Sequence, residues 1–513
     1  MRVQNSLRNM FFGVSGQIIS AIMGFIVRTV FIYTLGIEYL GIEGLFTSIL
    51  TMLSLANLGF DTAMIYSLYK PIAEKDTYKI QALMNLYQKA YRLIGIIILL
   101  IGLSLLPFLP YLINSQTTIN NLNIIYILFL LNSVSSYYFV YKHSIIIADQ
   151  RNHIISKIHA VFIILSNIAQ IIILLSIENY IVVLTTQIFF RIIENGYIAK
   201  KANTLYPFIK EKNKAKLSKK EKKSFFKNLY ALMLYKISGV VINGTDNIII
   251  SIFVGVTAVG IYSNYLLIIG TITTFLSYIF YSITASVGNL IVKESEEKKH
   301  FIFRILNFAN FWIYGFFAVC LWNLIDPFIS IWLGKQYVFD KYIVFAIILN
   351  FFTAGMQDAS STFRETTGLF NKGKYRPIFA AVINIVVSII LAKQIGLAGV
   401  LFGTVISRLC TYFWYDPYVI FKFVFKKSVK TYFFRYLLYL VLVLISTVIT
   451  DSLGNVLDNN VYINLVVRGI LCLIIPNMLF WIIFKSTEEF KYVWSIVSTL
   501  PNKLNSKELA KNA

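Results

Sequence analysis

Fourteen apolar runs, each close to the length that crosses a lipid bilayer, dominate this sequence. A transmembrane helix needs about 20 consecutive apolar residues. Inside hydrocarbon the backbone must satisfy its own polar groups, so such runs form helices. The sequence therefore predicts an all-α integral membrane protein with about 14 transmembrane helices. The runs are residues 11–34, 43–68, 90–113, 122–146, 156–176, 179–199, 229–254, 258–288, 302–325, 339–360, 376–393, 397–421, 432–450 and 461–484.

The composition agrees with a membrane protein, because hydrophobic residues make up 57% of the chain and charged residues 14%. The first run lacks a small-residue cleavage site, so we expect a retained span and not a signal peptide. Cys320, Cys410 and Cys472 all lie in apolar runs without the spacing of metal ligands. We therefore expect no metal site.

The basic residues predict the orientation of the chain. Roughly 39 of the 47 lysines and arginines fall on one side when the connections are assigned alternately to the two faces. The opposite loops carry acidic residues such as Glu38, Glu178 and Asp326. The positive-inside rule then places both termini in the cytoplasm of a multi-pass protein of the plasma membrane. The net charge of +23 is thereby a topology signal, and we expect no nucleic-acid partner.

Two similar turns indicate an internal repeat. Residues 36–41 (GIEYLG) follow the first apolar run, and residues 255–260 (GVTAVG) follow the seventh. We interpret the chain as two pseudo-symmetric six-helix lobes, related by an axis along the membrane normal, plus two C-terminal helices. The predicted divisions are an N-terminal lobe at 1–200, a basic cytoplasmic linker at 201–228, a C-terminal lobe at 229–425, two added helices at 426–485 and a cytoplasmic tail at 486–513.

Arg28 is a full positive charge inside the first apolar run. Gly13, Gln17, Ser20 and Gly24 precede it at spacings of three and four residues, on one face of the predicted helix. Charged side chains inside membranes face cavities or partners, because exposure to lipid is costly. This face is therefore predicted to line a polar cavity. The alternative is a helix-packing stripe with an arginine that reaches outward to the headgroups.

The seventh run has a second polar face. Lys236, Gly239 and Asn243 share it, and Asp246 lies nearby. Asp246 precedes Gly255 by nearly the same distance at which Arg28 precedes Gly36, so the two are candidate partners. The pair would be either structural or part of substrate or ion coupling.

Two further charged residues complete the candidate site. Asp61, in the second run, is a candidate site for a proton or cation, or else a buried, hydrogen-bonded carboxylate. Arg408, in the twelfth run, is a third candidate cation beside Arg28 and Lys236.

The sequence lacks the residues that some membrane-protein activities require. The sequence contains no Gly-x-x-x-x-Gly-Lys-Ser/Thr phosphate loop, which argues against ATP hydrolysis. The predicted outer loops are short and hold no cluster of histidines and acids, which disfavours a membrane polymerase or ligase. We expect a non-enzymatic transporter without a cofactor.

Three segments resemble bacterial polysaccharide transporters, which flip repeat units for O-antigen, capsule and exopolysaccharide. They are residues 35–76, 245–265 and 364–377 (RETTGLFNKGKYRP). These transporters belong to the multidrug/oligosaccharidyl-lipid/polysaccharide exporter superfamily. The resemblance implies a flippase that moves an undecaprenyl-diphosphate-linked oligosaccharide to the outer leaflet by alternating access. It also implies that Arg28, Lys236 and Arg408 bind the anionic head, and that a polymerase and glycosyltransferases are partners besides membrane lipids.

Two alternatives remain at this stage. A cation-coupled multidrug extruder of the same superfamily is the first, and a membrane polysaccharide polymerase or ligase is the second. For a flippase, proton coupling, sodium coupling and the membrane potential all stay open as driving forces.

Overall fold

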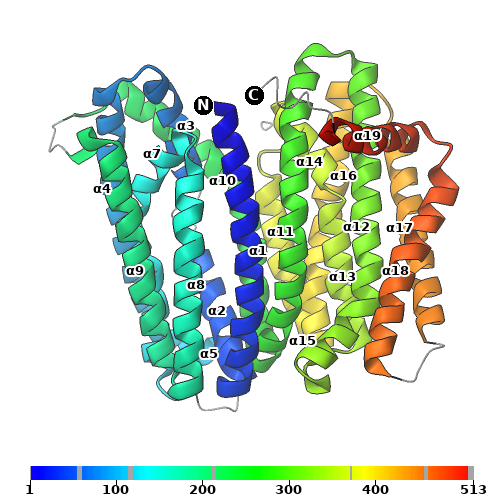
Figure 1. Cartoon of the computed structure of the whole chain (residues 1–513), viewed down its shortest axis with the longest axis horizontal. Helices are drawn as coiled ribbons and strands as arrows, with labels where there is room; N and C mark the ends of the chain where they lie inside the picture. The colour runs from blue at the N-terminus through cyan, green and yellow to red at the C-terminus, as the bar shows by residue number, and fades with distance from the viewer. Residues whose placement is uncertain are drawn as a thin grey trace. The chain divides into compact units, whose positions relative to one another are not determined.

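The computed structural model describes residues 2–54, 60–113, 119–210, 215–369, 372–455 and 460–505. Within these ranges every regular element is a helix, and the long helices run side by side in bundles (Figure 1). Eleven helices of the described part are long and apolar enough to cross a membrane. The predicted fold class, an all-α multi-pass membrane protein, is confirmed.

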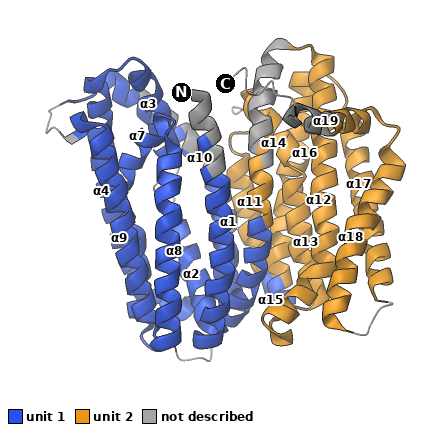
Figure 2. Cartoon of the chain, viewed as in Figure 1, with its two compact units in different colours: residues 1–271, 392–397 blue, residues 272–391, 398–513 orange. Residues whose placement is uncertain are grey.

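The chain divides into two compact units (Figure 2). Unit 1 comprises residues 1–271 and 392–397, and unit 2 comprises residues 272–391 and 398–513. The boundary falls within one long helix, α11. The lobe and linker divisions expected from the sequence stay predictions.

Unit 1 contains the helices up to α10 and the first part of α11. They are α1 (Arg2–Leu35), α2 (Ile37–Leu53), α3 (Phe60–Ala73), α4 (Thr77–Ser104), η2 (Leu106–Phe108), α5 (Leu109–Leu112), α6 (Leu122–Tyr137), η3 (Val140–Lys142), α7 (His143–Ala148), α8 (Asn152–Ser176), α9 (Tyr180–Leu205), η4 (Pro207–Lys210), α10 (Lys219–Phe253) and α11 (Val256–Lys293).

Unit 2 contains the rest of α11 and the helices after it. These are α12 (Glu296–Trp332), η5 (Lys335–Tyr337), α13 (Lys341–Gly355), α14 (Asp358–Thr366), α15 (Arg376–Cys410), α16 (Tyr412–Ile420), the π-helical turn η7 (Phe421–Phe425), α17 (Lys430–Gly454), α18 (Val461–Phe484) and α19 (Glu488–Asn505).

Two of the fourteen predicted runs, 43–68 and 229–254, are not among the spanning helices of the described residues, and two others are joined in one element. The run at 376–393 and the first part of the run at 397–421 both lie in α15, but they are two helices that turn back on each other at Ile395 and Gly396, since Ser388 Oγ donates to the Val400 carbonyl and Ser407 Oγ to the Ala380 carbonyl. Gly396 has φ +61°, which glycine adopts without steric cost. The run at 43–68 divides between α2 and α3, and the run at 229–254 lies in α10, whose side chains are only partly described.

The two repeated turns adopt matching structures. Gly36 (φ +92°) separates α1 from α2, and Gly255 (φ +120°) separates α10 from α11. The helices that follow the two turns then touch reciprocally: Gly41 lies against the carbonyl of Val256, and Gly260 lies against the carbonyl of Ile37. A Cβ atom at either glycine would collide with that backbone. The two contacts are equivalent when one turn is aligned with the other, so this crossing has local two-fold symmetry.

The basic segment after α9 is partly helical. Ser218 caps α10, and its side chain and that of Glu221 form a capping box. The Glu221 carboxylate also lies 2.8 Å from Lys79 Nζ at the start of α4. The hydrogen bond from Lys79 is the main cause that lowers the pKa of Glu221 to about 2. The end of the predicted linker therefore belongs to helix α10.

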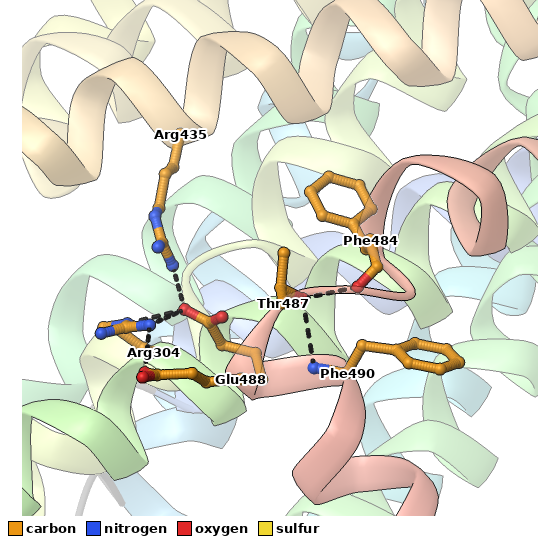
Figure 3. A network of polar contacts seen from close by, with 7 residues as sticks. Arg304, Arg435, Phe484, Thr487, Glu488 and Phe490 are labelled. Carbon is orange, nitrogen blue, oxygen red and sulfur yellow. Dashed lines mark hydrogen bonds and ion pairs between the residues drawn. The ribbon is translucent and has the colours of Figure 1, made fainter.

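The core of unit 2 is aromatic where α12, α17 and α18 pack together. Phe311 stacks on Tyr439 with ring centroids 4.0 Å apart, and Phe480 lies 4.6 Å from Phe311. The last helix, α19, lies across the ends of these helices (Figure 1). Arg304 of α12 and Arg435 of α17 both bind Glu489 of α19, and Arg304 also binds Glu488 (Figure 3).

Candidate functional site

Arg28 lies within α1 and is partly buried. Its Nη1 atom is buried and has no hydrogen-bond partner among the described residues. A buried donor without a partner is costly, since it has lost its hydrogen bonds to water. This atom is therefore available to an incoming acceptor.

Glu43 and Tyr180 are the groups that interact electrostatically with Arg28. Glu43 comes from α2 and Tyr180 from the first turn of α9. The Tyr180 ring is packed edge-on against Phe31, with centroids 5.2 Å apart, and against Tyr39 at 5.5 Å. The Tyr180 hydroxyl is also buried without a partner in the described structure. Three helices thus bring a cation, an acid and a hydroxyl together inside unit 1.

The polar face that precedes Arg28 is loosely packed. Gln17 and Ser20 are partly buried on α1. A Cβ atom added at Gly13 would have no neighbour within 4 Å among the described residues, and one at Gly24 would meet Leu267 of α11 at 3.8 Å. Among the described residues, no neighbouring helix packs closely against Gly13. This geometry agrees with an open polar face on α1.

Asp246 lies on α10 beside the contact between α10 and α2. Its neighbour Asn247 donates a hydrogen bond of 3.0 Å to Ser48 Oγ, and Asp246 itself interacts with Tyr262 of α11. The pairing of Asp246 with Arg28 stays a prediction. Lys236 and Asn243 also lie in α10, but their side chains lie outside the described part of the chain.

Asp61 opens α3 and accepts a hydrogen bond from the hydroxyl of Tyr91 on α4. Tyr91 is fully buried in a core cluster with Phe60 and Tyr87. Asp61 is thus partly buried and hydrogen-bonded.

Arg408 belongs to unit 2 and is held by α13. Its Nη1 atom donates to the Asn350 carbonyl at 3.0 Å and to Thr353 Oγ1 at 2.9 Å. These acceptors are neutral, so neither of these two partners cancels the positive charge of Arg408. Arg28 belongs to unit 1 and Arg408 to unit 2.

A cavity of about 460 Å³ in unit 1 collects titratable side chains from α7, α8 and α9. His159 Nδ1 lies 2.7 Å from Glu194 Oε1, and His143 Nε2 is buried without a partner among the described residues. Arg191 also lines this cavity and is exposed, so the cavity is open. A histidine and a carboxylate in hydrogen-bond contact can exchange a proton.

The segment RETTGLFNKGKYRP, at 364–377, folds around a buried ion cluster in unit 2. Arg364 and Arg376 both bind the carboxylate of Asp416 on α16, and Arg364 also donates to the Lys372 carbonyl. All three charged side chains are at most 9% exposed. This cluster joins the connection after α14 to α16, which is a structural role for both arginines.

No group of side chains suited to a metal ion occurs in the described part of the chain. This chain is similar to known proteins in three-dimensional structure, but sequence comparison finds no match. No protein-family model matches the chain, and no curated protein matches it.

Solved structures do match. The structure titled lipid II flippase MurJ, inward closed conformation, has a TM-score of 0.62 at 16% identity, covering 93% of this chain and 99% of that one. An inward-facing multidrug resistance MATE family transporter of the MOP superfamily has a TM-score of 0.58 at 13% identity, covering 78% and 94%. The MATE multidrug transporter DinF-BH has a TM-score of 0.58 at 15% identity, covering 83% and 96%. This chain has their fold. At these identities the likeness shows the fold and does not determine the substrate.

Two features of the site do not stand out in the sequence. Glu43 lies at the very start of the second apolar run, where a charge is easily taken as a helix end. His143 and His159 fall near predicted cytoplasmic helix ends, and their approach to Glu194 depends on the packing of α7, α8 and α9. The sequence feature that could have identified Glu43 as a site residue is its position in GIEGLF at 41–46, where it is the one charged residue among glycines and apolar residues.

Proposed function

We propose that this protein is a flippase that moves an undecaprenyl-diphosphate-linked oligosaccharide from the inner to the outer leaflet by alternating access, for capsule, O-antigen or exopolysaccharide synthesis. The fold shared with a lipid II flippase supports a lipid-linked substrate. The observation that carries the proposal is Arg28, a cation inside a spanning helix whose buried Nη1 atom has no partner among the described residues. A diphosphate oxygen would satisfy it.

The physical problem of flipping lies in the headgroup. An unpaired anion in hydrocarbon is very costly, so a diphosphate needs cationic and polar partners along its path. Arg28 supplies a cation, and Gln17 and Ser20 line the same helix face toward it. Lys236 and Arg408 are the further cations that we assign to the path.

The membrane potential is a sufficient driving force. Moving one elementary charge across 100 mV is worth about 2.3 kcal/mol. With the inside negative, outward movement of a headgroup with about two negative charges is favoured by roughly twice that amount. Coupling to protons or sodium would add to this force.

The test is transport of a fluorescent undecaprenyl-diphosphate-linked saccharide by purified protein in vesicles, with an imposed potential that favours export. We expect Arg28→Ala to abolish transport and Arg28→Lys to keep part of it, since a lysine retains the charge but loses the guanidinium geometry. Arg92→Ala is the matched control, because Arg92 is exposed on α4. Transport by Arg28→Ala at the rate of the unmodified protein would refute the role of Arg28.

A cation-coupled multidrug extruder is the second candidate. It is favoured by the titratable cavity around His159 and Glu194 and by the fold shared with MATE transporters. This candidate predicts export of organic cations that depends on a proton or sodium gradient and is lost in Glu194→Gln. Export of a cationic dye by the vesicles, without movement of the lipid-linked saccharide, would select the extruder over the flippase.

A further inference from the structure

Two hollows adjoin one another in unit 2, where α12 and α17 end and α18 begins. The topology predicted from the basic residues places these helix ends on the outer face of the membrane. One hollow is polar and measures about 760 Å³, and the other is an apolar slot of about 230 Å³. We call the polar hollow the outer cavity and the apolar one the slot.

The outer cavity has buried polar walls. Asn323 is 1% exposed, and Asp326 and Arg468 are each 8% exposed. Three asparagines of the α17 and α18 ends, Asn455, Asn460 and Asn464, also line it. Asn455 and Asn460 are exposed and Asn464 is partly buried, whereas the three buried groups each need a hydrogen-bond partner.

The charges of the outer cavity are largely paired with each other. Arg468 Nη1 lies 2.9 Å from Asp451, and Lys341 Nζ lies 3.1 Å from Asp326. Arg468 Nε also donates to Asn464 at 2.6 Å. A cavity with balanced, hydrogen-bonded charges attracts neither a free anion nor a metal ion strongly. It presents fixed donors and acceptors to a neutral polar ligand.

Asn323 provides an acceptor that the protein leaves unused. Its side-chain nitrogen donates to the Val319 carbonyl at 2.9 Å, while its buried Oδ1 has no partner in the described structure. A ligand hydroxyl that reached this oxygen would donate the hydrogen bond that it lacks.

The slot is continuous with the outer cavity through shared residues. Asp451 lines both hollows. Trp322 lines the slot, and Lys341 of the outer cavity lies over its ring at 5.0 Å. Apart from Thr447, Ser452 and Asp451, the walls of the slot are aliphatic and aromatic side chains of α12, α13 and α17, such as Phe345, Leu349 and Leu444. A hydrocarbon chain fits such a wall by burying apolar surface.

We propose that the outer cavity and the slot together bind a saccharide attached to a lipid, with the sugar hydroxyls in the cavity and the start of the hydrocarbon chain in the slot. The balanced charges favour the sugar over a bare phosphate head, and the slot favours a lipid-linked sugar over a free one. That this ligand is the transported molecule after flipping rests on the proposed function. The binding itself does not.

The experiment uses the full chain in lipid nanodiscs and a dodecyl maltoside that carries a diazirine on its sugar. After irradiation, the labelled peptides are identified by mass spectrometry. We expect label in the segments 323–341 and 451–468. A maltose derivative with the same diazirine but no chain should label these segments at least tenfold less, since it cannot use the slot.

Three variants sharpen the test. Asn323→Leu removes the free acceptor and should lower labelling about fivefold, the usual effect of one hydrogen bond. Asn310→Leu is its control: Asn310 is buried on the same helix, its Oδ1 also has no partner among described residues, and it does not line the cavity. Val448→Trp should close the slot and lower labelling by the chain-bearing probe, and because Val448 is exposed this change should leave folding intact.

Label confined to other segments, or equal labelling of Asn323→Leu and Asn310→Leu, would overturn the proposal. If Asn323→Leu fails to fold, Ser330→Trp, which fills the cavity from a partly exposed position, takes its place with the same expectation. Specific labelling in a protein that moves no lipid-linked saccharide would leave this site standing while the proposed function fails. Active transport without labelling here would do the reverse.

Discussion

The guanidinium of Arg28 on α1 interacts electrostatically with the carboxylate of Glu43 on α2, yet the two form no direct ion pair in the described structure. A neighbouring carboxylate offsets part of the cost of holding a cation inside a membrane. Because Arg28 Nη1 remains without a hydrogen bond among the described residues, the site keeps the capacity to bind an anion. Glu43 therefore stabilises the positive charge of Arg28 electrostatically but does not accept a hydrogen bond from its Nη1 atom.

Changes at Arg28 and Glu43 should act with opposite sign on an anionic substrate. Arg28→Gln should weaken binding of the undecaprenyl-diphosphate head about tenfold, which corresponds to about 1.4 kcal/mol. Glu43→Gln removes the competing negative charge and should strengthen binding severalfold. Substrate affinity in nanodiscs measures both effects, and changes of the same sign in both variants would contradict this arrangement.

The reciprocal crossing of α2 and α11 predicts two equivalent sensitive glycines. Gly41→Ala and Gly260→Ala each force a Cβ into a backbone carbonyl, so each should destabilise the protein by about 1–3 kcal/mol. Gly270→Ala is the control on the same helix α11, since its Cβ meets nothing within 4 Å in the described structure. Thermal unfolding in detergent measures the three variants. Equal midpoints for Gly260→Ala and Gly270→Ala would argue against the close crossing.

The contact of α19 with Arg304 and Arg435 should depend on Glu489 and much less on Glu488. The Glu489 side chain is 3% exposed, whereas that of Glu488 is 71% exposed. Removing the buried hydrogen-bonded charge should cost about 2–3 kcal/mol, and removing the exposed one less than about 1 kcal/mol. Hydrogen exchange of α19 in Glu489→Gln and Glu488→Gln compares them. Equal protection of α19 in both variants would contradict the larger contribution of Glu489.

The same contact predicts loss of α19 docking in acid. Burial by itself would raise the pKa of Glu489, but the hydrogen bonds from Arg304 and Arg435 outweigh it and lower the pKa to about 2. A carboxylate with a lowered folded-state pKa stabilises the fold above its ordinary value near 4.5, and this contribution is lost as the pH falls toward 2. Protection of α19 should therefore decline between about pH 4.5 and 2. In Glu489→Gln this decline should be absent.

The ion cluster of Arg364, Arg376 and Asp416 should respond unequally to loss of its members. Asp416→Asn leaves two buried guanidinium groups without their shared carboxylate, so we expect a loss of about 3–5 kcal/mol. Arg376→Met leaves one arginine paired with Asp416 and should cost less. Thermal unfolding ranks the two, and the greater loss in Arg376→Met would oppose this interpretation.

Much of the fold follows from local sequence. The apolar runs predict the spanning helices because a helix satisfies its backbone within one segment. The turns at Gly36 and Gly255 are predictable since their φ angles favour glycine. The turn at Gly396 is likewise predictable, because Lys393 and Gln394 interrupt the apolar sequence where the runs at 376–393 and 397–421 meet.

The candidate site is only partly accessible from the sequence. Arg28, Asp61 and Asp246 stand out because charges are rare in apolar runs. Their neighbours do not stand out: Tyr91 reaches Asp61 from α4, and Glu43 approaches Arg28 from α2. A spacing along one helix cannot reveal a contact made by another.

The sequence by itself determined the membrane as the environment, the helical class and the residues that carry charge into the bilayer, since hydrophobicity and helix periodicity act over neighbouring residues. Only the tertiary structure decided which charges are satisfied. It paired Asp416 with two arginines and Arg408 with α13, and it left Oδ1 of Asn323, a residue that lines a cavity, without a partner among the described residues. Those outcomes depend on how helices distant in the chain pack, because hydrogen bonds form only between groups that packing brings within about 3 Å.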